Sequence, residues 1–289
     1  MCGIAGYIGP KMGDQVLIVA LERLKYRGYD SAGMVVQADG ELHLRRASGK
    51  LKNLADLLET APLRGHCGIA HTRWATHGAP TEANCHPHLS SDATVAVVHN
   101  GIIENHEALR RELQGQGVVF NSETDTEVIP HLIRSLYTGD AVAAVGAAMA
   151  RLEGSFALAV MFADHPDRII AARLGSPLLV GRGNDEMLLA SDVPALLPHA
   201  HEYLIIADGQ IADLHRDSCH LTTLDGTTVE SVFKPIEITA EAVSKGSFDS
   251  FMAKEIAEQP DVLARLLDSR LRGGFLVEPD LGLDLAAVK

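Results

Sequence analysis

The sequence predicts an α+β fold in which antiparallel sheets pack face to face and helices cover them on the outside. Two observations lead to this prediction. Short apolar runs joined by turn residues occur at both ends of residues 1–230, and segments of helical periodicity lie between them. A third observation is the length of 289 residues, which exceeds one average domain and predicts a second unit.

The first part of the chain alternates between strands and helices. After the apolar residues 3–8, Asp14 can cap a helix that ends at Arg27-Gly28. Asp39-Gly40 separates two runs of strand character and predicts a hairpin. Residues 67–70 and 95–98 are continuous apolar runs, typical of strands buried on both faces, and both lead into polar residues.

The second part contains three predicted helices followed by six predicted strands. The helices are expected over residues 104–113, 126–137 and 141–152. The strands are expected over residues 156–162, 168–172, 178–180, 187–190, 203–206 and 211–214. Asp208-Gly209 predicts a hairpin between the last two strands.

The composition shifts after residue 230, where we place the end of the first domain. Residues 231–247 lose strand alternation and include Pro235 and Gly246, which predicts a linker. Beyond it, residues 251–258 and 262–271 are predicted as two helices separated by Pro260. Because two helices cannot form a core, residues 248–289 are expected to be the start of a further domain.

Charge and apolar patterning argue against two classes of partner. The chain has 25 basic and 38 acidic residues and a net charge of -13, the wrong sign for a nucleic acid binder. No apolar run reaches the ~18 residues of a membrane span, and no secretory signal opens the chain. We therefore expect a cytoplasmic protein with reduced thiols, since its four cysteines are too few and too scattered for a disulfide scaffold.

Cys2 is the first candidate catalytic residue. If the initiator methionine is removed, this residue carries a thiol and an α-amine, so that nucleophile and base lie on one residue. The glycines Gly3 and Gly6 are expected to leave room for a substrate beside the first strand. The alternative is a buried first strand with a chance cysteine.

The segment His71-Thr72-Arg73-Trp74-Ala75-Thr76-His77-Gly78 is a candidate binding loop. The guanidinium of Arg73 matches a carboxylate in a bidentate manner, which suits a small carboxylic substrate. The alternative is a surface turn with a salt-bridged arginine. The histidines of this region and the cysteines form no complete set of metal-ligand spacings, so no metal is predicted.

Two further segments add polar groups. In His99-Asn100-Gly101, the amide of Asn100 and the N–H of Gly101 can stabilise an oxyanion, although Asn-Gly is also a common turn pair. In Ser122-Glu123-Thr124-Asp125-Thr126-Glu127, the acids suit a helix start, and Asp125 can also hold an ammonium group. A thiol, a carboxylate binder, an oxyanion site and an ammonium acceptor together describe a site for glutamine.

These segments, together with Met1-Cys2-Gly3-Ile4-Ala5-Gly6 and Tyr26-Arg27-Gly28-Tyr29-Asp30-Ser31-Ala32-Gly33, resemble the class II glutamine amidotransferases, which have an N-terminal cysteine. Within that family the resemblance is to members that pass ammonia to fructose 6-phosphate. It implies a four-layer αββα sandwich of the N-terminal-nucleophile hydrolase type, with residues 2–230 as the glutaminase domain and residues 248–289 as the start of a truncated sugar-isomerase half.

The resemblance also implies roles for individual residues. Cys2 would form a γ-glutamyl thioester, stabilised by Asn100 and Gly101. The substrate-binding residues would be Arg73, Trp74, Thr76, His77 and Asp125, and the supporting residues Arg27 and Tyr29.

The resemblance implies no cofactor, glutamine as the substrate, and fructose 6-phosphate as a partner of the full-length enzyme only, which would be a homo-oligomer. The alternatives are the glutaminase domain of another class II amidotransferase and a glutamine-binding sensor without turnover.

Overall fold

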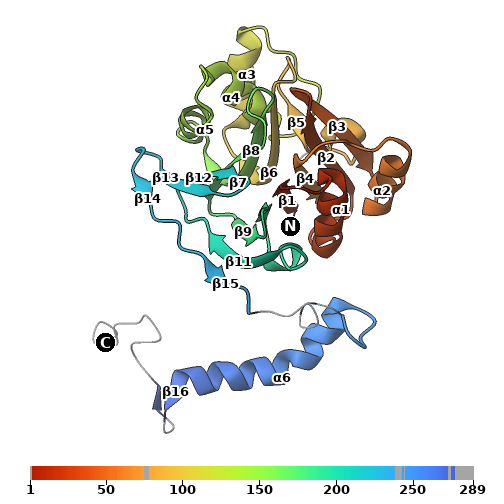
Figure 1. Ribbon diagram of the computed structural model, residues 1–289, viewed down its shortest axis with the longest axis vertical. Helices are drawn as coiled ribbons and strands as arrows, with labels where there is room; N and C mark the ends of the chain where they lie inside the picture. The colour runs from red at the N-terminus through yellow and green to blue at the C-terminus, as the bar shows by residue number, and fades with distance from the viewer. Residues whose placement is uncertain (1, 75–77, 238–242, 244, 273–274, 277–289) are drawn as a thin grey trace. The chain divides into compact units, whose positions relative to one another are not determined.

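The computed structural model describes residues 2–74, 78–237, 243, 245–272 and 275–276 (Figure 1). The chain divides into two compact units, Met1–Glu237 and Ile238–Lys289. The division falls within residues 231–247, the segment predicted as a linker. The first unit extends past residue 230 because the short strand β15 (Lys234–Pro235) pairs with another strand of that unit.

Two antiparallel sheets form the centre of the first unit. In the part of the chain that the structure describes, the first sheet has eight strands in the order β15-β11-β9-β10-β1-β4-β2-β3. Besides β15 its strands are β1 (Gly3–Ile8), β2 (Ser31–Ala38), β3 (Glu41–Ser48), β4 (Cys67–Arg73), β9 (Leu179–Gly183), β10 (Met187–Ala190) and β11 (Ala200–Ile205).

The second sheet has seven strands among the described residues, in the order β14-β13-β12-β8-β7-β6-β5. They are β5 (His88–Leu89), β6 (Val95–Ile103), β7 (Gly154–Phe162), β8 (Arg168–Leu174), β12 (Gln210–His215), β13 (Cys219–Thr223) and β14 (Thr228–Val229). Two single turns of 3₁₀-helix, η1 (Glu82–Asn84) and η2 (Val193–Ala195), lie in the loops.

Helices cover the outer face of each sheet (Figure 1). The helices α1 (Gly13–Leu24) and α2 (Leu51–Thr60) bury apolar side chains against the first sheet. The helices α3 (His106–Gly115), α4 (Val128–Leu136) and α5 (Ala141–Met149) do so against the second sheet. A third apolar cluster fills the space between the sheets. The predicted α+β sandwich and its four αββα layers are confirmed.

The alternation of side chains along the strands explains why the space between the two sheets is polar at one end. On β1, Ile4 and Ile8 face the space between the sheets, and on β4 Cys67 and Ile69 do so. Successive side chains of a strand point to opposite faces, so every second residue continues the same face. Cys2 before β1, His71 and Arg73 on β4, and Asn100 on β6 therefore share one end of the space between the sheets.

The first predicted hairpin is confirmed and the second is wrong. β2 and β3 pair across Asp39 and Gly40, both of which have positive φ, as a tight hairpin turn requires. The turn at Asp208 and Gly209 instead joins β11 of the first sheet to β12 of the second. An Asp-Gly pair specifies a reversal of the chain, whereas the strands on each side choose their own partners, β9 for β11 and β8 for β12.

In the described part of the second unit, one long helix takes the place of the two that were predicted. The helix α6 (Phe251–Arg270) runs through Pro260, and the side chain of Ser250 caps its N-terminus. A proline removes a single helical hydrogen bond, and the flanking residues are good helix formers, so the helix continues. The strands β16 (Leu271–Arg272) and β17 (Phe275–Leu276) follow it. Across the described residues, no helix has the length and apolar character needed to span a membrane.

Candidate active site

Cys2 lies directly before β1 and is held from two sides. The backbone N–H of Trp74 donates to Cys2 Sγ at 3.2 Å, and the thiol lies 3.5 Å from the carbonyl oxygen of Trp74. The carbonyl oxygen of Cys2 accepts from Arg27 Nε at 3.0 Å and from Asn100 Nδ2 at 3.1 Å. The nucleophile candidate therefore has a fixed backbone and a thiol that is half-buried.

A cavity of about 340 Å³ opens beside this thiol. It is lined by Cys2, Arg27, Trp74, Asn100, Gly101, Ile102, Ser176 and Pro177. Residues from five separate segments of the sequence thus meet at one hollow, and five of these residues are site residues predicted from the sequence. Its volume is of the order expected for a small-molecule site.

Three of the lining residues were not predicted as site residues, namely Ile102, Ser176 and Pro177. The two last lie between β8 and β9, where the Oγ atoms of Ser155 and Ser176 are 3.1 Å apart and Asp208 accepts from Gly175 N at 2.8 Å. The turn that was misread as a hairpin therefore holds this loop. The only signal in the sequence is a Gly-Ser-Pro turn, which does not point to a site.

Asn100 and Gly101, which the sequence predicts as an oxyanion pair, lie near the end of β6 and line the cavity. The Asn100 amide donates to the Cys2 carbonyl, and its Oδ1 lies 3.0 Å from His71 Nε2. Gly101 has φ +127°, and a Cβ atom there would lie 1.9 Å from the carbonyl oxygen of Ser155. Only glycine fits at that position, so the backbone N–H next to Asn100 depends on it.

Arg73 and Asp125 are both buried, and Arg73 directly precedes the lining residue Trp74. The Arg73 guanidinium donates to the carbonyl oxygens of Gly78 at 3.1 Å and Ala79 at 3.4 Å. Asp125 Oδ2 accepts from the N–H of Ile103, the neighbour of the lining residue Ile102, at 2.9 Å. The predicted binding residues Thr76 and His77 lie outside the described residues.

The loop that carries Asp125 is anchored by Glu127. The Glu127 carboxylate accepts from the N–H of Asn121 at 2.8 Å, from the N–H of Ser122 at 2.7 Å and from the Ser122 hydroxyl at 2.6 Å. These hydrogen bonds, with the His131 ring whose Nε2 lies 3.8 Å from Oε1, hold the pKa of Glu127 at about 2 against the effect of burial. Glu127 stands at the N-cap position of α4, as the expected helix start requires, but its side chain makes no cap hydrogen bond and holds the preceding loop instead.

Trp74 and Tyr29 lie at the exposed edge of the site. Their rings meet edge to face with centroids 5.2 Å apart, and both side chains are exposed. Gly28 permits this arrangement, because a Cβ atom there would lie 2.8 Å from the backbone of Arg73. The segment around Arg27 thus packs directly against the end of β4.

Comparisons with known proteins agree with this geometry. Residues 71–198 match the family described as a glutamine amidotransferase domain. Over its whole length the chain is 46% identical to the glutamine–fructose-6-phosphate aminotransferase of Symbiobacterium thermophilum, of which it covers 48%. Over 94% of its length it is 47% identical to the enzyme of the same name from Thermus thermophilus, of which it covers 45%.

The chain belongs to the class II glutamine amidotransferases. The resemblance predicted from the five motifs is thereby confirmed. The glutamine phosphoribosylpyrophosphate amidotransferase of B. subtilis, solved with ADP and GMP, is similar in fold, with a TM-score of 0.68 and 26% identity over 77% of this chain and 49% of that one. The chain spans about half the length of the curated relatives it matches.

The amidotransferase site keeps its thiol and its imidazoles neutral. Burial raises the pKa of the Cys2 thiol, and the Trp74 N–H and the Arg73 charge oppose that change only in part. Burial lowers the pKa of His71 to about 3 and that of His99 to about 4. A neutral thiol needs a base before it can attack a carbonyl carbon.

Gly3 and Gly6 do not leave room for a substrate in this amidotransferase, contrary to the expectation from the sequence. A Cβ atom at Gly3 would lie 2.7 Å from Thr72 Oγ1, and one at Gly6 would lie 3.0 Å from Leu189 Cβ. Both glycines instead allow neighbouring strands and layers to pack closely around β1.

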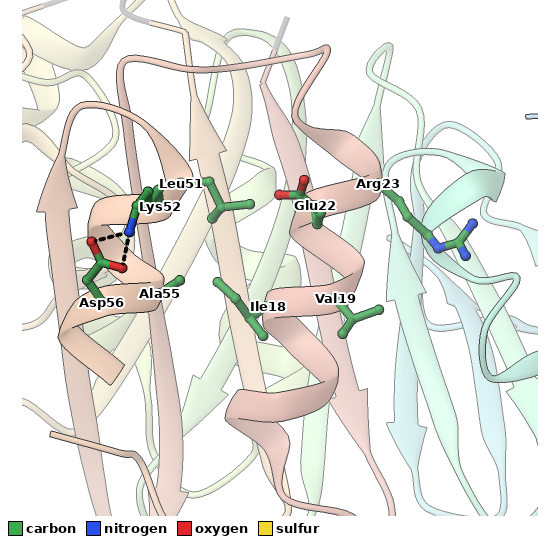
Figure 2. Close-up of a pocket in the computed structure, with 8 residues that line it drawn as sticks. All are labelled: Ile18, Val19, Glu22, Arg23, Leu51, Lys52, Ala55 and Asp56. Atoms are coloured by element: carbon green, nitrogen blue, oxygen red, sulfur yellow. Dashed lines mark hydrogen bonds and ion pairs between the residues drawn. The ribbon is translucent and has the colours of Figure 1, made fainter. Parts of the chain in front are cut away.

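A second, larger hollow of about 670 Å³ lies between α1 and α2 (Figure 2). Figure 2 shows Ile18, Leu51 and Ala55 along its inner side, and Lys52 paired with Asp56 at its edge. No cysteine, serine or threonine is among the residues that line it. Among the described residues, no group of three or more His, Cys, Asp and Glu side chains is arranged to hold a metal ion.

Proposed function

We propose that this chain hydrolyses glutamine to glutamate and ammonia through a γ-glutamyl thioester on Cys2. The observation that supports the proposal best is the meeting of the Cys2 thiol, the Asn100 amide and Gly101 at one cavity of about 340 Å³. We further propose that in the whole protein the ammonia passes to fructose 6-phosphate and yields glucosamine 6-phosphate. The names of the two curated relatives support this second step.

The first half of the reaction forms the thioester. After removal of Met1, the α-amine of Cys2 takes the thiol proton while Sγ bonds to the side-chain carbonyl carbon of glutamine. The carbonyl oxygen becomes an oxyanion, which the Asn100 amide and the Gly101 N–H stabilise. The C–N bond then breaks, and the ammonium formed from the Cys2 amine returns its proton to the leaving ammonia.

The second half consumes water. A water molecule adds to the thioester carbon and gives one proton to the same amine, so that a second oxyanion forms at the same donors. The C–S bond then breaks, the thiolate recovers the proton, and glutamate leaves. No cofactor enters either half.

Substrate recognition is assigned to the two buried charges. Arg73 would bind the α-carboxylate of glutamine, with Thr76 and His77, and Asp125 would accept hydrogen bonds from the α-ammonium. Trp74 would close the site, and Arg27 would support it through the carbonyl of Cys2. Tyr29 would brace Trp74 through their ring contact.

The remaining assignments concern the whole protein. We propose that residues 2–230 form the glutaminase domain and that residues 248–289 begin a sugar-isomerase half. The full-length protein would be a homo-oligomer with no nucleic acid or membrane partner.

Glutamate release by a Cys2→Ala variant tests the proposal. Intact mass measurement first establishes that Met1 is lost, and wild type is then expected to release glutamate and to form γ-glutamyl hydroxamate with hydroxylamine. The Cys2→Ala variant should do neither. Cys219→Ala is the matched control, because that thiol is buried and its pKa is raised to about 12 by burial, so turnover should persist.

Two outcomes would contradict the proposal. Turnover by Cys2→Ala would exclude the thioester. Glutamine binding by a mature chain that still carries Met1 and releases no glutamate would favour a sensor, because the proposed base would then be absent.

A further inference from the structure

His71 touches the oxyanion donor and has no part in the proposed reaction so far. It lies on β4, fully buried, and its Nε2 is 3.0 Å from Asn100 Oδ1 on β6 of the other sheet. Both polar atoms of the Asn100 amide therefore have a partner: Nδ2 donates to the Cys2 carbonyl, and Oδ1 contacts His71.

The chemistry of these partners fixes the direction of the amide. A carbonyl oxygen accepts hydrogen bonds and cannot donate them, so the atom of Asn100 that faces Cys2 O must be the NH₂ group. Oδ1 then faces His71, and Nε2 of the ring must carry the proton that Oδ1 accepts. With one N–H on the Cys2 carbonyl, the second N–H of Asn100 has a defined direction at the cavity that Asn100 lines.

The surroundings hold the His71 ring in place. It stacks on the ring of His86, with centroids 4.2 Å apart and planes inclined by 29°. Full burial keeps the imidazole neutral, with the pKa lowered to about 3, so it carries a single N–H across the working pH range. Without that donor, the Asn100 amide could rotate and turn its oxygen toward the forming oxyanion.

We propose that His71 is a positioning residue for glutamine hydrolysis, which holds the Asn100 amide with its N–H groups toward Cys2 and the oxyanion. This inference rests on the glutaminase function proposed above and adds a group that does not touch the substrate. A fixed donor costs no reorganisation during the reaction, which is the source of its catalytic effect. A histidine with a purely structural role would affect stability and leave the rate constant of hydrolysis unchanged.

The test compares His71→Leu with His71→Gln in the same chain. Leucine removes the donor, and kcat should fall about 10- to 100-fold, below the ~10²- to 10³-fold loss expected for an entire oxyanion donor. The KM for glutamine should stay within about twofold, because the α-carboxylate and α-ammonium contacts are untouched. Glutamine carries an N–H near the position of Nε2, so His71→Gln should recover most of kcat.

A double-mutant cycle separates positioning from structure. If His71 acts through Asn100, His71→Leu should cause no further loss of kcat in an Asn100→Ala background. His165→Leu, a half-buried histidine whose Nε2 lies 2.9 Å from the Tyr137 hydroxyl, is the control for removing a ring and should retain turnover. Full kcat in His71→Leu, or equal losses in both backgrounds, would overturn the inference.

A second measurement keeps the inference distinct from the proposed function. If wild type releases no glutamate, the proposed function fails, and the side-chain NH₂ resonances of Asn100 then decide the question of His71. These resonances should shift in His71→Leu and return toward their wild-type positions in His71→Gln. Resonances that are the same in all three proteins would overturn the inference even in an inactive chain.

Discussion

Two hollows of the first unit, the groove between α1 and α2 and the cavity at Cys2, differ in size and in chemistry, and the smaller one holds the candidate site. The hollow between α1 and α2 measures about 670 Å³, and the cavity at Cys2 about 340 Å³. The larger is a groove between two helices on the outer face of a sheet, with exposed ion pairs at its edge. The smaller lies where the layer between the sheets ends in polar residues.

The cavity at Cys2 and the groove differ in whether polar groups from separate elements meet at one atom. At the Cys2 cavity, an amide, a guanidinium and a backbone N–H are each held by named hydrogen bonds around one thiol. In the groove, Lys52 and Asp56 pair with each other on one helix, four residues apart. A pocket becomes a candidate active site when polar groups from separate elements converge on a reactive atom, and volume alone does not show this.

The first prediction is that low pH reduces the free energy of unfolding through the buried histidines around Cys2. We call this polar end of the space between the sheets the catalytic end. Burial lowers the pKa of His71 and His88 to about 3 and that of His99 to about 4, and it lowers the pKa of His86 well below its usual value. An unfolded histidine has a pKa near 6.5, so below that pH the unfolded chain binds more protons and stability falls as pH drops. The expected loss reaches about 1.4 kcal/mol per pH unit for each ring, or several kcal/mol between pH 7.5 and 5.5.

Urea unfolding at the two pH values measures this loss. The groove offers the control, since Asp56→Asn removes an exposed carboxylate there and should leave the pH dependence unchanged. An unfolding midpoint that is the same at pH 7.5 and 5.5 would show that these imidazoles are not neutral and buried in the folded state.

The strand patterns explain how much of this site could be predicted from the sequence. Residues 67–70 and 95–98 are apolar, and the polar residues after them, such as Arg73 and Asn100, were expected to be functional. Their position at one end of the space between the sheets follows from a two-residue period on two strands. The sequence could not predict that β4 and β6 belong to different sheets that face each other.

Other parts depended on long-range contacts that leave no local signal. Ser176 lines the cavity because Asp208, a turn residue far along the chain, holds the neighbouring Gly175. Gly3 was expected to make room for a substrate. A residue without a side chain can either leave space for a ligand or let neighbouring strands pack closely, and only the position of Thr72 decides between these two roles. His71 was grouped with the binding loop, and its contact with Asn100 joins residues of two sheets.

The second prediction concerns the buried guanidinium at the catalytic end. Arg73→Gln should raise the KM for glutamine about 10- to 100-fold, since a hydrogen bond to a charged group contributes roughly 1.5–3 kcal/mol. The loss of kcat should be smaller, because the carboxylate is bound in the ground state and the transition state alike. Steady-state kinetics with Arg23→Gln at the groove as the control would test it, and an unchanged KM for Arg73→Gln would refute the assigned role.

The smallest effect is expected for changes inside the groove. Ala55→Leu would fill part of the larger hollow, and Lys52→Ala would remove its exposed ion pair (Figure 2). Neither should change kcat or KM, because the strands of the first sheet separate the groove on their outer face from Cys2 on their inner face. If Ala55→Leu lowered kcat at an unchanged unfolding midpoint, the groove would be coupled to the catalytic end through α1 and β1. The larger volume of the groove would then have indicated a functional site.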